Sequence, residues 1–241
     1  MKTLQFGQDK YVGDPLNAVR IFNEKEADEM IVLDIDATVL NSTLNYSLIK
    51  NLAAECRMPL CYGGGVKEVD QIKKIIGLGV EKVAVSSAAI DNPRLVSEGA
   101  NRVGSQSIVV VMDVRKKTTG TGYDLCTHNA TRVTGICPKS FARQMEESGA
   151  GELVINSIDR DGTMKGFDLD LICEVRDGLT IPMTVLGGAG SLSDIGNLYK
   201  QFGVVGAAAG SIFVFKGKYK AVLINYPDQI ERDSIFASNN T

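Results

Sequence analysis

The chain has 241 residues, with 26 Lys and Arg against 29 Asp and Glu, a single His and a formal net charge of −3. This mild negative charge argues against nucleic acid or an anionic membrane as the main partner, and the chain is long enough to bury a core without disulfides or metals. Glycine is frequent, at 25 residues, and the length suits one α/β barrel as a single domain spanning residues 1–241.

The N-terminus and the cysteines predict a cytoplasmic protein. No run approaches the roughly 20 apolar residues of a membrane span, and residues 1–7 lack the apolar core of a signal peptide. The cysteines follow no CxxC spacing, so with one His a zinc cluster is not expected, and neither a metal nor a cofactor is predicted. Five buried, reduced thiols are expected instead, at Cys56, Cys61, Cys126, Cys137 and Cys173.

Seven short runs rich in Val, Ile and Ala predict parallel strands covered on both faces, because each run is continuously apolar rather than alternating. They lie at residues 31–35, 59–62, 82–85, 108–112, 152–155, 182–186 and 204–208. A further run at residues 2–6 is short and abuts a turn, so we expect it to belong to a loop hairpin.

Helix signals separate these strands. Asp14 followed by Pro15, and Asn92 followed by Pro93, each predict a capping residue with proline at the first helical position. Residues 140–148 and 193–202 are polar and apolar mixtures of helical length. Strand and helix therefore alternate, which predicts a parallel sheet or a barrel.

An internal repeat favours the barrel. Three features of the first half return in order in the second half at a nearly constant separation. They are Asp36 with Asp159, residues 63–65 with 187–189, and residues 85–89 with 207–211. Two similar halves of about four βα units each predict a (β/α)8 TIM barrel. Only seven strong strands are found, three in the first half and four in the second, so the first strand is apparently missing from this chain.

Glycine clusters follow a strand in each half and predict phosphate binding. Gly65 and Gly188 belong to these clusters, and glycine there lets backbone N–H groups approach an anion closely. The next strand in each half ends in small and hydroxyl residues, namely Ser86, Ser87, Gly210 and Ser211. One site in each half implies a substrate with phosphates at both ends, the alternative being glycine used only for tight turns.

Acidic residues stand at three strand ends. Asp113 follows an apolar run and should project at the top of the barrel, where a carboxylate can act as general acid or base. The alternative is a salt bridge with Arg115 or Lys116. Asp34 follows another strand, and Asp161 lies in a loop-like run where it could orient a substrate or cap the loop.

Charged residues also stand at the starts of strands, which form the bottom of the barrel. Glu29, Lys82 and Glu152 could gate an axial passage, or they could be a solvated rim. His128 lies in a polar loop predicted over residues 121–135. Such a loop could cover the active site, although a solvated loop histidine is the simpler interpretation.

These residues resemble the cyclase subunit of imidazole glycerol phosphate synthase, HisF. The similarity covers nearly the whole chain, and its most specific part is the run at residues 157–162 followed by the glycines at 187–190. That family takes ammonia from a glutaminase subunit docked at the barrel bottom. It uses the ammonia to cleave and cyclise a doubly phosphorylated ribonucleotide, so the resemblance implies a lyase/cyclase subunit of a glutamine amidotransferase complex.

The resemblance also implies roles for single residues. Asp113 would be the general acid, and Asp34 and Asp161 would line the pocket. Lys2 would belong to the family's mobile first loop. One phosphate site would involve Gly65, Ser86 and Ser87, although the family usually has Asn-Thr at the last two positions; the other would involve Gly188, Gly210 and Ser211. Glu29, Lys82 and Glu152 match three of four gate residues.

Two departures keep other functions open. The family's proposed general base and its fourth gate residue lie on the first strand, upstream of this sequence. The tail at residues 216–227 resembles HisF paralogues associated with amidation of surface sugars, in which the first aspartate is expected to be absent. The alternatives are therefore a non-cyclising paralogue that activates a glutaminase and channels ammonia to a sugar amidotransferase, and a sister phosphoribosyl isomerase. The run at 157–162 and the three-charge gate argue against the isomerase.

Overall fold

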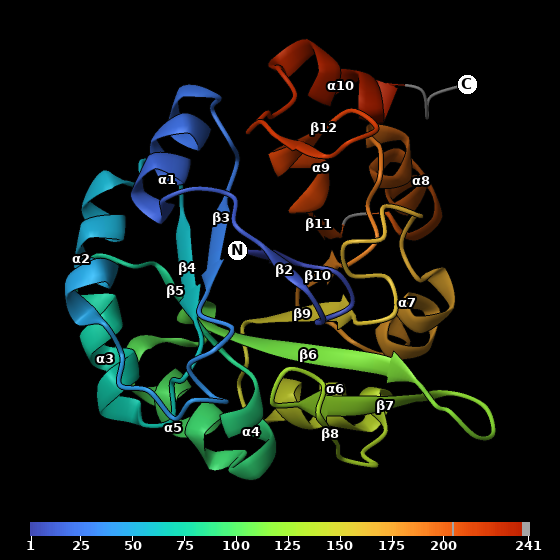
Figure 1. The fold of residues 1–241 in the computed structure, drawn as a ribbon. Helices are drawn as coiled ribbons and strands as arrows, with labels where there is room; N and C mark the ends of the chain where they lie inside the picture. The colour runs from blue at the N-terminus through green and yellow to red at the C-terminus, as the bar shows by residue number, and fades with distance from the viewer. Residues whose placement is uncertain (204, 238–241) are drawn as a thin grey trace.

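The computed structural model describes residues 1–203 and 205–237. Seven parallel strands curl into an open barrel in the order β11-β10-β9-β6-β5-β4-β3 (Figure 1). They are β3 (Met30–Leu33), β4 (Leu60–Gly63), β5 (Lys82–Val85), β6 (Ile108–Lys116), β9 (Glu152–Ser157), β10 (Met183–Leu186) and β11 (Gly206–Ala208). All seven predicted strands are confirmed, although Val204 at the start of the last predicted run lies outside the described residues. Within those residues, no strand pairs with the outer edge of β3 or of β11.

Helices cover the outer side of this sheet, giving a TIM-barrel-like α/β fold. They are α1 (Pro15–Glu24), α2 (Tyr46–Glu55), α3 (Val69–Gly77), α4 (Ser87–Asp91), α5 (Arg94–Val103), α6 (Pro138–Glu147), α7 (Leu169–Arg176), α8 (Leu192–Phe202), α9 (Ser211–Val214) and α10 (Gln229–Ala237), with a 3-10 turn at Ser105–Ser107. Asp14 caps α1 as predicted, accepting from the Asn17 amide 3.1 Å away. The second capping prediction is wrong, because Pro93 itself is the capping residue of α5 and no side chain caps that helix.

Antiparallel strand pairs extend beyond the barrel at three places in the described structure. β1 (Lys2–Thr3) pairs with β2 (Asp9–Lys10), which confirms the hairpin predicted near the N-terminus. β12 (Phe215–Lys216) pairs with β13 (Ala221–Val222). The third contradicts the loop predicted over residues 121–135, since β7 (Tyr123–Thr127) pairs with an extension of β6 and with β8 (Arg132–Val133).

The error at residues 121–135 has a physical reason. Tyr123, Leu125 and Cys126 are buried, but the same strand also contains the polar residues Asp124 and Thr127. The segment also holds Gly122, Asn129 and Gly135, which are residue types typical of turns, so its overall composition resembles that of a loop. His128 lies at the turn between β7 and β8, where its Nδ1 is 3.0 Å from Thr127 Oγ1.

The core has two layers that follow the period-two geometry of the strands. On β6, Val110, Met112 and Val114 pack toward the helices in the large outer cluster. Val109 and Val111 instead join the inner cluster of the barrel, whose other buried members are Cys61, Ala84 and Val154. Asp113 continues the series 109, 111, 113, so the strand presents it to the barrel interior above this small apolar layer.

The cysteine prediction is only partly correct. Cys61 and Cys126 are buried and Cys56 is half-buried, but Cys137 and Cys173 are exposed. Both exposed thiols sit at or on outer helices, where one face of the helix meets solvent. No helix in the described ranges is long and apolar enough to cross a membrane.

Candidate functional site

A small cavity opens where β10 and β11 end, at the carboxyl edge of the sheet. Gly187 and Gly188 follow β10 with φ values of 94° and 109°, a region that favours glycine. A Cβ at Gly188 would collide with the carbonyl oxygen of Gly166, so the backbone packs too closely for a side chain. The lining residues are Lys2, Asp161, Gly162, Leu186, Gly187, Gly188, Ala189, Ala208, Ala209, Gly210 and Ser211. We call these residues the second cradle.

The equivalent place in the first half follows β4 and β5, and we call residues 63–65 with Ser86 and Ser87 the first cradle. Gly64 and Gly65 have φ values of 107° and 72°. A Cβ at Gly64 would collide with the carbonyl oxygen of Asp34. The Asp34 carboxylate accepts backbone hydrogen bonds from Asp36 at 3.2 Å and from Ala37 at 3.1 Å, so it shapes the neighbouring loop.

The two cradles share backbone geometry, which supports the internal repeat. Gly64 and Gly188 have nearly equal φ angles, and each packs against a carbonyl of the preceding βα unit. Ser86 and Gly210 each precede a short helix, α4 and α9. The structure therefore pairs Ser87 with Ser211. The loose sequence alignment of residues 85–89 with 207–211 pairs Ser87 with Ala209 instead, so that alignment is wrong by two residues.

Two serine hydroxyls in the cradles are buried without a partner. The Oγ atoms of Ser86 and Ser211 have no hydrogen bond within the described part of the chain. A buried hydroxyl that lacks a partner costs roughly 1–3 kcal/mol. Ser86 directly precedes α4 and Ser211 is the first residue of α9, so the two hydroxyls occupy adjacent rather than equivalent positions in their halves.

The β1–β2 hairpin docks beside the second cradle through Asp161. Lys2 Nζ lies 2.6 Å from Asp161 Oδ1 and Thr3 Oγ1 lies 2.9 Å from Asp161 Oδ2. The Gln5 amide donates to the Asp161 carbonyl at 3.0 Å, and the Gln5 side chain donates to the Asp159 carbonyl at 2.7 Å. The almost buried Asp161 carboxylate therefore holds the hairpin in place and brings the Lys2 ammonium to the cavity. Sequence reasoning missed Thr3 and Gln5, whose residue types are ordinary for a surface hairpin.

Asp113 faces the interior from β6 and accepts a hydrogen bond from Asn156 Nδ2 at 2.9 Å. Burial is the main cause that raises the pKa of Asp113 to about 6, and the nearby charge of Asp161 raises this pKa as well. The hydrogen bond from Asn156 lowers the pKa but does not offset these two effects. The salt-bridge alternative is wrong, because Arg115 donates to the Ala130 carbonyl and no ion pair of Asp113 occurs in the described structure. Asn156 was missed, although a polar residue in an apolar strand is a usable signal.

Three charges meet at the amino ends of the strands. Lys82 Nζ lies 2.7 Å from Glu29 Oε1 and 2.9 Å from Glu152 Oε2. Burial lowers the pKa of Lys82, but hydrogen bonds to both carboxylates outweigh burial and leave this pKa raised. Thr184 Oγ1, a residue that the sequence did not single out, donates to Glu152 Oε1 at 2.6 Å. The predicted gate residues thus form one bonded cluster, which is more than a solvated rim requires.

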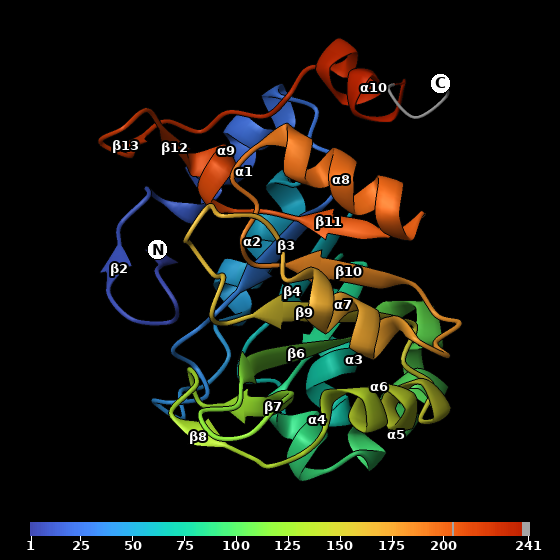
Figure 2. The same ribbon diagram turned by 90° about the vertical axis from the view of Figure 1, so that its right-hand side faces the viewer.

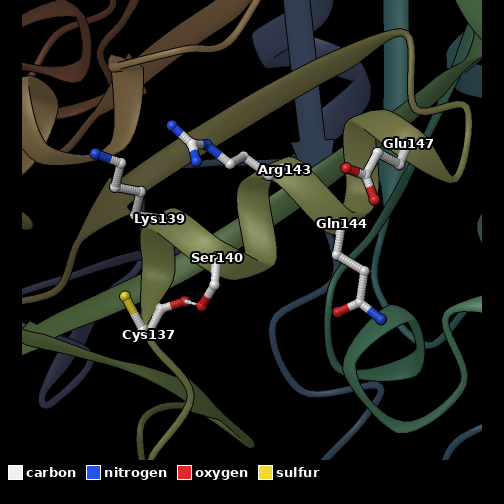
Figure 3. A pocket seen from close by; sticks show the side chains of 6 residues that line it. All are labelled: Cys137, Lys139, Ser140, Arg143, Gln144 and Glu147. Carbon is white, nitrogen blue, oxygen red and sulfur yellow. Dashed lines mark hydrogen bonds between the residues drawn. The ribbon is translucent and has the colours of Figure 1, made fainter.

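A separate pocket lies on the outer surface of α6 and is lined by Cys137, Lys139, Ser140, Arg143, Gln144 and Glu147 (Figure 3). Two of these side chains are engaged elsewhere, since Lys139 pairs with Asp177 and Arg143 donates to the Asp177 carbonyl. It shares no lining residue with the second cradle.

The fold and this geometry define an α/β-barrel protein with duplicated glycine loops at the carboxyl ends of its strands. The model of the histidine biosynthesis protein family matches residues 1–220. The chain therefore belongs to this family, and its similar relatives make it HisF-like.

Three relatives document that similarity. A Leptospira borgpetersenii protein provisionally named imidazole glycerol phosphate synthase subunit HisF is 53% identical over 98% of this chain and 93% of its own length. A Vibrio vulnificus protein, provisionally named the same subunit and designated hisF3, is 54% identical over 96% of this chain and 89% of its own. A Natranaerobius thermophilus protein named imidazole glycerol phosphate synthase subunit HisF is 35% identical over 94% and 89%.

Proposed function

We propose that this chain is a synthase subunit of the HisF type, which receives ammonia from a glutaminase subunit and uses it to cleave and cyclise a bis-phosphorylated ribonucleotide. The observation that carries the proposal is that each cradle holds one buried hydroxyl without a partner in the described structure, Ser86 in the first and Ser211 in the second. Two anion sites of the same construction suit a substrate with a phosphate at each end. The names of the relatives point to the same reaction.

Asp113 is the proposed general acid. Its raised pKa of about 6 leaves a useful protonated fraction near neutral pH, which general acid catalysis requires. The charged cluster of Glu29, Lys82 and Glu152 is the proposed gate for ammonia at the bottom of the barrel. Between the two lies the small apolar layer that includes Cys61 and Ala84, residues that fill less space than Leu or Ile.

The second candidate is a non-cyclising paralogue that activates a glutaminase and passes ammonia to a sugar amidotransferase. It is favoured by one observation among the relatives. The Vibrio vulnificus relative, which is 54% identical to this chain, carries the numbered name hisF3. A numbered copy suits a role besides the biosynthetic cyclase.

Turnover of the doubly phosphorylated ribonucleotide with added ammonium tests the proposal. We expect the wild-type chain to consume the substrate and Asp113→Asn to lose this activity while still binding inorganic phosphate. Asp124→Asn is the matched control, because Asp124 lies on β7 and pairs loosely with Lys117 at 3.9 Å. Phosphate binding without any turnover by the wild-type chain would reject the cyclase and leave the ammonia-passing paralogue.

A further inference from the structure

The N-terminal and C-terminal hairpins meet beside the second cradle. Lys10 Nζ on β2 donates to the Lys220 carbonyl at 2.8 Å and lies 5.2 Å from the centre of the Phe215 ring on β12. Figure 2 shows both hairpins at the end of the barrel toward which the strand arrows point. One ammonium thus joins two segments that lie at opposite ends of the chain.

The β12–β13 hairpin is itself fixed to the second cradle. The segment that follows β13 is tied to α9, since the Leu223 amide donates to the Val214 carbonyl at 3.0 Å and the Asn225 amide donates to the Phe213 carbonyl at 2.7 Å. Helix α9 begins at Ser211, whose hydroxyl is one of the two unpartnered ones. The hairpin therefore has a firm base next to the anion site.

The same hairpin reaches the far wall of the cavity. Lys220 Nζ lies 3.5 Å from the carbonyl oxygen of Gly162, the residue after Asp161. Gly162 packs directly under the β1–β2 hairpin, where a Cβ would collide with the Thr3 carbonyl oxygen. The β12–β13 hairpin therefore contacts both the docked hairpin and the loop on which it docks.

We infer that the β12–β13 hairpin is a clasp that keeps the β1–β2 hairpin closed, with Lys10 as the positioning residue that sets Lys2 in the second cradle. Strands of two residues have little stability of their own, so the β1–β2 hairpin depends on such contacts. A lysine that is already ordered binds an anion without the entropic cost of fixing its side chain. This role rests on the proposed anion site, and it adds a residue that touches no ligand.

Amide hydrogen exchange at Gln5 reports directly on the clasp, because that amide bonds to Asp161 only while the hairpin is docked. Lys10→Met keeps the aliphatic stem but removes the charge. Its loss of one hydrogen bond and one cation–π contact should speed exchange at Gln5 about tenfold. Phe215→Leu should speed it less, and Lys10→Arg should restore it, since guanidinium can make both contacts. Lys218→Met, on the exposed tip of the same hairpin, is the control.

Titration with inorganic phosphate separates the clasp from the proposed function. Lys10→Met should weaken phosphate binding several-fold while Lys10→Arg and Lys218→Met retain it. Unchanged Gln5 exchange in Lys10→Met, in a variant that keeps the wild-type unfolding transition, would overturn the clasp. Equal acceleration by Lys218→Met would overturn it as well. If wild-type protein bound no phosphate, the anion site would be wrong, and the exchange rates would still decide whether Lys10 holds the hairpin.

Discussion

The amide nitrogen of Asn156 donates to one carboxylate oxygen of Asp113, 2.9 Å away, across the paired strands β9 and β6. This single bond opposes the burial of the carboxylate, because it favours the ionised form while burial favours the neutral one. Burial dominates, and the pKa of Asp113 rises to about 6. The Asp113 carboxyl group is therefore about half protonated at slightly acid pH.

Asp113→Asn should stabilise the protein at pH 7. The folded pKa of Asp113, about 6, exceeds the ordinary value of 3.8. The native state therefore binds more protons than the unfolded chain between these pH values, and stability falls as pH rises through this window. Removing the buried charge should recover up to about 3 kcal/mol at pH 7 and almost nothing below pH ~4.

Urea denaturation of wild type and Asp113→Asn across pH 4 to 7 measures this difference. The two free energies of unfolding should converge toward the acid end, provided that both transitions are two-state. A constant difference across the whole range would show that Asp113 does not titrate as described.

Asn156→Leu should raise the pKa of Asp113 further, by roughly one unit, because a charge-assisted hydrogen bond to the ionised form is lost. Carbon-13 NMR of labelled aspartate carboxyls gives this pKa directly. Ser157→Ala is the matched control, since Ser157 is the next residue on β9 and its side chain points to the other face of the sheet. A shift of equal size in both variants would remove the special role of Asn156.

The strands and the matched glycines could be predicted from the sequence because both signals are local. Continuous apolar runs give buried parallel strands, and glycine is required wherever φ is positive beside a close backbone contact. The hairpin at β7 and β8 was missed because the glycine and polar residues of this segment give it the composition of a loop. The contacts of Asp113 and Asp161 could not be predicted either, although Asn156 itself stands out as a polar residue in an apolar strand. Asn156, Thr3 and Gln5 reach them by strand register and docking, which depend on contacts between residues far apart in the sequence.

Gly64→Ala and Gly188→Ala should each destabilise the protein by more than about 2 kcal/mol, because both residues combine positive φ with a carbonyl in the place of a Cβ. Gly203→Ala is the first control, since its φ is 69° but nothing lies within 4 Å, so only backbone strain applies. Gly77→Ala is the second, and it should be neutral or slightly stabilising at the end of α3. Thermal unfolding ranks the four variants, and equal losses at Gly188 and Gly203 would contradict the close packing of the cradle.

Cys137 should react with a thiol reagent faster than Cys61 and Cys126. Its side chain is exposed, and hydrogen bonds from the Ser140 backbone and hydroxyl lower the pKa of the thiol. Burial raises the pKa of both Cys61 and Cys126. Labelling at pH 7.5 followed by peptide mapping should find the fast phase at Cys137, and Cys137→Ser should remove it. A fast phase that survives in Cys137→Ser would place the reactive thiol elsewhere, with exposed Cys173 the first to examine.

Lys82→Met should impair glutamine-dependent activity more than ammonium-dependent activity if the bottom cluster gates ammonia supplied by a glutaminase. Lys82 bonds to both Glu29 and Glu152, so its removal leaves two carboxylates facing each other at the barrel mouth. These will repel and open or distort that entrance, whereas ammonium added to the solution does not depend on delivery through it. Thr184→Val removes only one hydrogen bond to Glu152 and keeps both ion pairs, so it should change the ratio of the two activities less. Parallel assays with glutamine and with ammonium give this ratio for each variant. Equal losses in both assays would mean that the three charges stabilise the barrel mouth and do not control the passage of ammonia.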